Sequence, residues 1–302
     1  MAIFNMVWWG GWWWAVEIKD WLCFTTNIPL STIKLQKNWT PTAVTLETST
    51  DGSSWSTYTF WDVITLSNVW DKVYFRNTSE TDTWFSSWFA NCYQFVMTGS
   101  ILWSWDTNYL LNKNSTNTVP NNWFYRLFHW CSALKVAPNL PATNLGSSCY
   151  AYMFYDCTSL SVMPYLPAKT LNNYCYVYMF RNCKALVDIP NLSFTTTSTE
   201  CCMYMFQWCT NLIKLPKLLT LSQTYTSITL ANRCFMWMFY QCSLIKLSST
   251  QTWDYQTAYK IPTKWIWTNW TNSLTDMFLS TGWTFTGTPS INTNYYTSNT
   301  VV

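Results

Sequence analysis

Glycine, histidine and charge are all scarce in this chain. Its 302 residues include 7 glycines, a single histidine and only 10% charged side chains, with a formal net charge of +3. The 17 Lys and Arg residues are scattered, which argues against a nucleic-acid partner because affinity for phosphate backbones needs clustered cations. A chain of this length is predicted to hold about two domains.

The single histidine disfavours catalysis. Hydrolases with a Ser or Cys nucleophile position a histidine against a partner, and zinc sites usually recruit several ligands. His129 has no such partner nearby in the sequence, and its flanks (LFHWC) are typical of a helix end. We therefore expect a structural histidine and a protein that is not an enzyme, with no cofactor, metal or catalytic site.

Membrane-spanning and leader patterns are missing as well. The apolar run from Met6 to Val16 is shorter than the ~18 residues that cross a bilayer. The first residues lack the basic segment and cleavage site of a secretory signal, so we expect neither a leader nor a transmembrane segment. The tryptophans of this run could form an interfacial anchor, but no basic residue precedes Lys19.

What the chain does have is a repeat of 26 residues. Copies begin at Asn121, Ser147, Asn173 and Thr199, and a fifth follows a 7-residue insertion. A degenerate sixth copy is marked by Met277 and Phe278. Periods of this length predict a solenoid, in which each unit buries its apolar face against its neighbours. The cysteine that marks the period recurs at Cys131, Cys157, Cys183 and Cys209.

The spacing within one unit predicts one helix and one strand. Apolar residues at i, i+4, i+8 and i+11 from Cys149 fall within about 80° on a helical wheel, as a buried stripe would. A Leu-x-x-apolar-Pro motif follows, as in Leu160 to Pro164, and predicts a short strand because Pro cannot continue a ladder. We expect an α/β leucine-rich-repeat solenoid of 26-residue repeats with a C-terminal cap over residues 119–302.

The 12 cysteines allow two interpretations. Equivalent residues of neighbouring repeats would lie about 4.8 Å apart, so a disulfide between Cys157 and Cys183 is geometrically feasible. Cysteine also packs as a small buried hydrophobe, and a ladder at one phase of the repeat favours free, buried thiols. No copy carries the Cys-x-x-Cys pair of zinc ribbons, so a metal cluster is not expected.

Residues 17–118 predict a small all-β, sandwich-like domain. Short alternating runs are separated by polar turns, and Asp51-Gly52 between two of them is a hairpin signal. Residues 1–16 are predicted to be an N-terminal linker or tail, and the polar stretch 112–122 a linker into the repeats. The predicted strands are Thr32–Lys37, Ala43–Thr48, Ser56–Phe60, Val63–Leu66, Lys72–Arg76 and Tyr93–Met97.

The repeats resemble the BspA-type leucine-rich repeats of bacterial surface proteins. The resemblance covers Asn121 to about Val302 and is strongest over Cys149 to Leu171 (CYAYMFYDCTSL…PYLPAKTL). The preceding region, with STDGSSW and DKVYFRN, is similar to a module often found ahead of such repeats. The resemblance implies non-catalytic adhesion at the cell surface or outside the cell. Host or neighbouring-cell surface or matrix proteins, or glycans, would be the partners.

A second hypothesis is a structural or receptor-binding component of a phage tail fibre. The missing leader and the N-terminal linker favour it. In either case the exposed positions beside the strand leucines would form rows on one face of the solenoid. Each member could equally be a solvated strand residue without a partner. The candidate rows are Asn139, Tyr165, Asn191 and Lys217, and Val136, Val162, Asp188, Lys214 and Lys246.

The 23 tryptophans invert the usual ratio of Trp to Gly. Trp130 and Trp208 stand where sister copies have Asp156 and Asn182, at a position that favours a left-handed backbone and hence glycine. Trp70 lies in a predicted turn. We hypothesise that many of these residues are glycines in an organism that reads UGA as glycine. The alternative is a Trp-rich carbohydrate or membrane binder.

Overall fold

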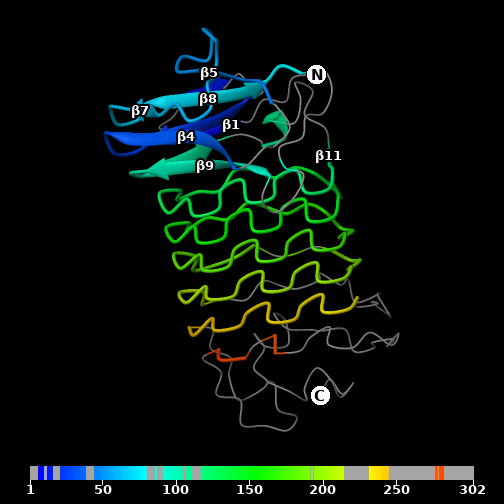
Figure 1. The fold of residues 1–302 in the computed structure, drawn as a ribbon. Helices are drawn as coiled ribbons and strands as arrows, with labels where there is room; N and C mark the ends of the chain where they lie inside the picture. The colour runs from blue at the N-terminus through cyan, green and yellow to red at the C-terminus, as the bar shows by residue number, and fades with distance from the viewer. Residues whose placement is uncertain are drawn as a thin grey trace.

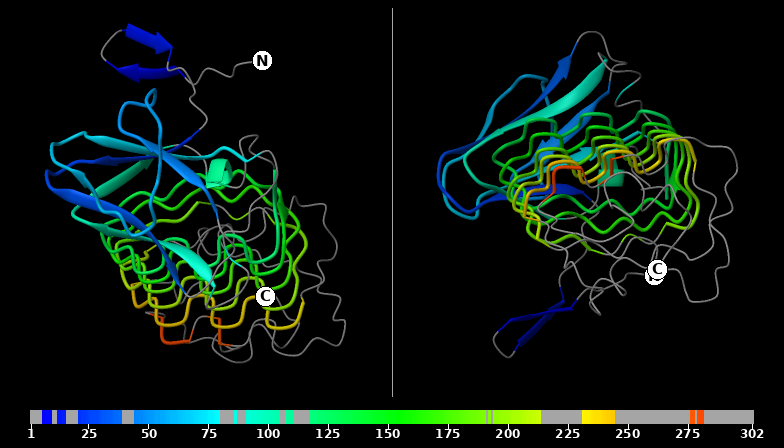
Figure 2. Two further views of the ribbon diagram at one scale, coloured as in Figure 1. Left: turned by 45° about the horizontal axis from the view of Figure 1, so that its top comes forward. Right: turned by 90° about the horizontal axis from the view of Figure 1, so that it is seen from below.

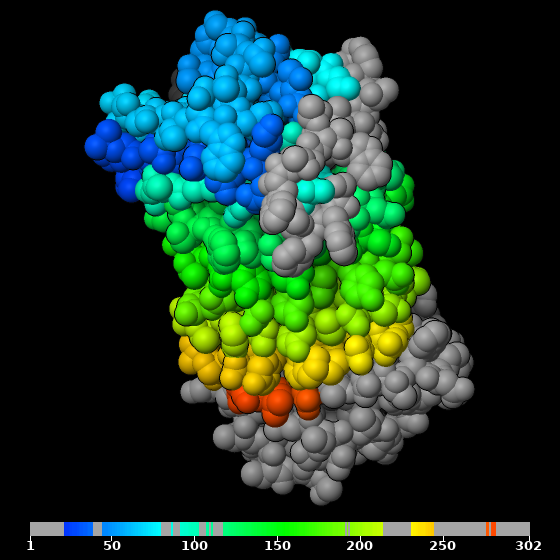
Figure 3. Space-filling model, in the orientation of Figure 1, coloured from blue at the N-terminus to red at the C-terminus, as the bar shows by residue number. Residues whose placement is uncertain are grey.

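The computed structural model describes residues 6–9, 12–15, 21–38, 44–79, 86, 91–104, 107–110, 117–190, 192, 194–213, 231–244, 276–277 and 279–281. Antiparallel sheets lie at one end of this part, and a stack of coils extends from them (Figure 1). The space-filling view shows the two parts joined in one column (Figure 3). The described residues contain no α-helix, only the 3₁₀ turn η1 (Thr107–Leu110).

Two antiparallel sheets make up the N-terminal region. Their strand orders are β10-β3-β8-β5-β6 and β7-β4-β9. Each of the six predicted strands overlaps an observed one, whereas β3 and β10 were not predicted. The bounds are β3 (Leu22–Thr26), β4 (Ser31–Asn38), β5 (Leu46–Ser49), β6 (Ser56–Thr57), β7 (Ile64–Leu66), β8 (Lys72–Asn77), β9 (Cys92–Thr98) and β10 (Ile101–Ser104).

Aromatic side chains join the two sheets. Phe24 and Phe75 of the larger sheet contact Phe95 of the smaller one, with ring centroids 5.0 and 5.3 Å apart. All three are fully buried, and along β4 buried residues alternate with half-buried ones. This alternation turns one face of each sheet toward a shared apolar core. Asp51 and Gly52 lie in the turn between the paired strands β5 and β6.

Two shorter strand pairs involve segments that were predicted to be linkers. β1 (Met6–Trp9) pairs antiparallel with β2 (Trp12–Ala15), within the predicted N-terminal tail. β11 (Thr118–Val119), within the predicted linker to the repeats, pairs in parallel with β12 (Asn144–Leu145), one repeat further on. The stack of coils therefore already includes the end of that linker.

The predicted α/β leucine-rich-repeat solenoid is wrong, because the described repeats contain no helix. Each repeat begins instead with a zigzag of consecutive turns, visible as stacked waves in Figure 1. In the second repeat the amides of Met153 and Tyr155 donate to carbonyls three residues back, at 3.2 Å. A helix would bond four residues back. The zigzag segments are residues 121–131, 147–157, 173–183, 199–209 and 232–242.

The other amides of a zigzag donate to the next coil. The amide of Tyr152 donates to the carbonyl of Val177 at 3.0 Å, and that of Phe154 to Met179 at 2.9 Å. Alternate backbone groups are therefore satisfied only when coils stack, as a buried backbone requires. Seen along the stack, each coil is a flattened loop with the zigzag on one long side (Figure 2). We call the residues that follow each zigzag, 132–145 in the first coil, the return segment.

The helix prediction failed because the zigzag also has a period close to a helical turn. Every second turn has its third residue in the left-handed conformation, so such residues recur four apart, as at Ser148, Tyr152 and Asp156. The residue that follows each of these is buried, and these buried residues are Cys149, Met153 and Cys157. Three positions at a spacing of four cannot be distinguished from the 3.6-residue period of an amphipathic helix.

A ladder of phenylalanines runs through the core of the stack. Neighbouring rings of Phe95, Phe128, Phe154, Phe180, Phe206 and Phe239 stack 5.3–5.6 Å apart. Because Phe95 belongs to β9, the ladder continues the core of the sheets into the coils. The amide of Phe95 donates to the carbonyl of Leu127 at 2.8 Å. Strand β9 thus covers the first coil.

Candidate functional site

The predicted binding rows lie on the return segments. Asn139, Tyr165 and Asp188 are all exposed, as a binding row requires. Val136 and Val162 form a parallel bridge between neighbouring coils, so the stack does bring members of a row side by side. Asn191, Lys214, Lys217 and Lys246 lie outside the described residues.

Large apolar side chains are exposed on three successive return segments. Val162 and Tyr165 are 53% and 60% exposed in the second coil. Val187 and Ile213, in the next two coils, are 47% and 52% exposed, and the amide of Ile213 donates to the carbonyl of Val187 at 3.0 Å. Exposed apolar side chains on neighbouring segments are candidates for an interaction site.

A column of aromatic residues on the zigzag segments was not predicted. Tyr152, Tyr178 and Tyr204 are half-buried and occupy the same left-handed position in three successive coils. Their ring centroids lie 4.7 and 4.5 Å apart, and Trp237 stacks below Tyr204 at 4.7 Å. The sequence did carry a signal for this column, because tyrosine recurs at the same position in three successive repeats. We call these three residues the tyrosine column.

Arg181 lies among the rings beside this column. The guanidinium carbon is 5.1 Å from the Tyr155 ring centroid, 5.3 Å from that of Tyr178 and 4.1 Å from that of Trp208. Arg181 makes no ion pair with any residue in the described part of the chain, and its Nε is buried without a hydrogen-bond partner there. Cation–π contacts therefore hold this side chain.

The carboxylates of the same surface are already engaged. Asp156 accepts hydrogen bonds from the Trp130 indole at 2.9 Å and from the Asn182 amide. Glu200 pairs with Arg233 at 3.3 Å. Burial, followed by the neighbouring tyrosines, raises the pKa of Tyr178, so its hydroxyl is neutral at physiological pH. Both carboxylates therefore have other partners, and neither forms an ion pair with Arg181 among the described residues.

His129 is buried and neutral. Its ring lies 4.9 Å from that of Tyr155 and 4.3 Å from that of Trp130. Burial, and then the nearby Arg126 charge, lowers the pKa of His129 to about 3. The imidazole is thus packed among aromatic rings, as expected for a structural residue.

All 12 cysteines are free and buried, so the prediction of unbonded thiol ladders is confirmed. In the ladder that marks the repeat, Cys131 donates to the carbonyl of Phe95 in β9, and each later thiol donates to a phenylalanine carbonyl of the preceding coil, as Cys157 does to Phe128 at 3.0 Å. Cys183 and Cys209 repeat this bond at 3.1 Å. Burial raises the pKa of the Cys209 thiol to about 12, so these groups are poor nucleophiles.

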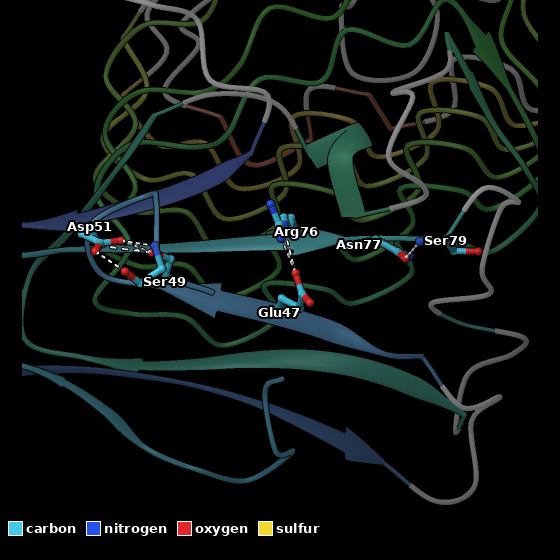
Figure 4. A network of polar contacts seen from close by, with 7 residues as sticks. Glu47, Ser49, Asp51, Arg76, Asn77 and Ser79 are labelled. Carbon is cyan, nitrogen blue, oxygen red and sulfur yellow. Dashed lines mark hydrogen bonds and ion pairs between the residues drawn. The ribbon is translucent and has the colours of Figure 1, made fainter. Parts of the chain in front are cut away.

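A polar network follows β5 and β8 in the N-terminal region (Figure 4). Arg76 pairs with Glu47 at 2.6 Å, and its guanidinium lies 3.9 Å from the Trp55 ring centroid. The Asp51 carboxylate accepts the amides of Ser53 and Ser54 at 2.7 Å. These hydrogen bonds lower the pKa of Asp51, and the Ser49 hydroxyl at the end of β5 also donates to this carboxylate. Arg76 therefore already has an ion-pair partner in Glu47.

Several tryptophans adopt the backbone conformation that favours glycine. Trp61 and Trp70, with φ of 78° and 71°, are the third residues of turns closed by Asp62-to-Thr59 and Asp71-to-Asn68 hydrogen bonds. A left-handed third residue defines a type II turn, where glycine is strongly preferred. Trp130, Trp208 and Trp237 are also left-handed. The left-handed backbone expected at Trp130 and Trp208 is confirmed, although it closes a turn and not a helix.

The described part of the chain thus forms a stack of helix-free coils, covered at one end by two β-sheets. No family model, curated protein or solved structure matches the chain. The described residues contain no helix that is long and apolar enough to cross a membrane. The described residues also contain no group of three or more His, Cys, Asp or Glu side chains placed to hold a metal ion.

Proposed function

We propose that this protein is a non-catalytic adhesion protein of the cell surface or extracellular space. It binds a surface or matrix protein through the return segments of its coils. The observation that carries the proposal is the exposure of Val162, Tyr165, Val187 and Ile213 on three successive coils. The resemblance of the repeats to those of bacterial surface proteins supports the same function.

The arrangement suits a protein partner. Stacked repeats present an extended surface, and aromatic side chains surrounded by smaller contacts are common energetic centres of protein interfaces. Tyr165 is the most exposed aromatic residue of the return segments that the structure describes, and Asp188 lies exposed on the next coil. Apolar side chains would contribute affinity at the centre of the contact, and charged ones orientation at its rim.

Binding of the purified full chain to immobilised cells and matrix proteins tests this function. We expect saturable binding that Tyr165→Ser weakens about tenfold, because aromatic residues central to an interface contribute about 1–2 kcal/mol or more. Tyr174→Ser is the matched control. Tyr174 is exposed on a zigzag segment, and the preceding coil has Ser148 at the same phase. The absence of saturable binding, or equal losses in both variants, would contradict the proposal.

A further inference from the structure

Arg181 is a preorganised cation with unused hydrogen-bonding capacity. Its planar guanidinium is held by Tyr155, Tyr178 and Trp208, and no carboxylate of the described residues pairs with it. Most exposed arginines lose side-chain freedom when they bind, whereas a guanidinium stacked on rings has already lost part of it. If residue 208 were glycine, the nearest ring contact would be lost, and the longer contacts with Tyr155 and Tyr178 at 5.1 and 5.3 Å would remain.

The neighbouring rings determine what can approach. The Tyr178 ring stacks with both Tyr152 and Tyr204, at centroid distances of 4.7 and 4.5 Å, and leaves only part of a face to the Arg181 guanidinium. A sugar ring that stacks on an aromatic side chain needs a free face, so the interior of the tyrosine column does not suit a glycan. The edges of aromatic rings carry partial positive charge and therefore favour an anionic group.

We propose that Arg181 and the tyrosine column form a docking site for an acidic segment of a partner protein. A carboxylate of that segment takes a bidentate hydrogen bond from the guanidinium, in the geometry that arginine provides. Glu200 is ion-paired with Arg233, and Asp156 is hydrogen-bonded by Asn182, so neither carboxylate is bound to the Arg181 guanidinium. Tyrosine and arginine together are also typical of the residues that dominate protein interfaces.

This site is separate from the proposed binding rows. Arg181 and the tyrosine column lie on the zigzag segments, whereas the binding surface proposed above lies on the return segments and depends on the exposed side chains of Val162, Tyr165, Val187 and Ile213. Binding to an acidic chain is therefore expected to be unaffected by Tyr165→Ser. A failure of one proposal would leave the other standing.

Titration of the purified full chain with short poly-L-glutamate tests the site, with poly-L-glutamine and a polyuronate as comparison polymers. We expect binding to poly-L-glutamate alone, and Arg181→Gln to weaken it about 10- to 100-fold, as for the loss of a charge-assisted hydrogen bond. Lys184→Gln removes the same charge from an exposed residue nearby and is expected to change affinity less than about twofold.

Arg181→Lys separates geometry from charge. It keeps the cation but loses the planar fork, so we expect a loss of affinity between those of the wild type and Arg181→Gln. Thermal unfolding shows whether Arg181→Gln folds. If it does not, the affinity of Arg181→Lys for poly-L-glutamate still tests the site. The site would be overturned by no binding of the wild type to poly-L-glutamate, by equal affinity of the wild type and Arg181→Lys, or by stronger binding to the polyuronate.

Discussion

Replacing Trp70 by glycine is predicted to stabilise the protein. Trp70 has φ of 71° as the third residue of a type II turn. A left-handed L-residue costs roughly 1–2 kcal/mol, and the greater freedom of glycine in the unfolded chain returns about 0.5–1 kcal/mol of that. Relief of the strain therefore leaves a net gain of about 0.5–1 kcal/mol.

Loss of the indole should subtract little from this gain. Trp70 is 64% exposed, and unfolded chains themselves hide about 10–40% of such surface. The expected increase in Tm is about 1–3 °C for a chain of this size. Calorimetry would measure this increase in Tm, and urea unfolding would measure the gain in the free energy of unfolding.

Trp55→Gly is the matched control. Trp55 has no left-handed backbone, and its ring lies 3.9 Å from the Arg76 guanidinium and 4.6 Å from the Trp21 ring. Removing these contacts and adding a glycine should destabilise the protein by about 1.5–3 kcal/mol. The two substitutions thus have opposite signs. A Trp70→Gly variant less stable than the wild type would refute the reasoning.

Three further predictions concern the core and the coding sequence. Phe154→Ala should cost about 3–5 kcal/mol in urea unfolding, because the ring is fully buried and stacks on both neighbours at 5.4 and 5.3 Å. A cost below about 1 kcal/mol would contradict the ladder. Burial raises the pKa of Cys209 from an ordinary 9.0 to about 12, so its contribution to stability is intact below about pH 9 and is lost as the pH rises toward 12. Unfolding free energies measured at intervals over that range should therefore fall, and should fall less steeply in Cys209→Ala; equal slopes would contradict this. The codons for Trp70, Trp130 and Trp208 should include UGA, and UGG at all three would contradict the glycine hypothesis.

Alternation of buried and half-buried residues made β4 predictable, and its absence hid β3, although β9 was predicted without it. β4 alternates between buried and half-buried residues, and this period of two is readable in the sequence. In β3 four of the five residues are buried, so there is no alternation to detect. Burial of Cys149, Met153 and Cys157 was predicted correctly from the repeat, but the conformation that buries them was not.

Some residues of the candidate sites could likewise be predicted from the sequence, and others could not. Exposure at Tyr165 and Asp188 could be expected, because residues beside a buried leucine tend to face solvent. Arg181 could not be identified, because its site depends on rings from three coils that only the stacking brings together. A helix at the zigzag would have separated these side chains. The tyrosine column, in contrast, could have been found from the phase shared by Tyr152, Tyr178 and Tyr204.

The central claim is that the repeats are helix-free coils joined by hydrogen bonds between neighbours, since both proposed surfaces depend on this stacking. Far-ultraviolet circular dichroism of the full chain tests it most directly. We expect a spectrum of strands and turns without the double minimum of α-helix. A helical contribution large enough to place one helix in each repeat would contradict the fold and both surfaces built on it.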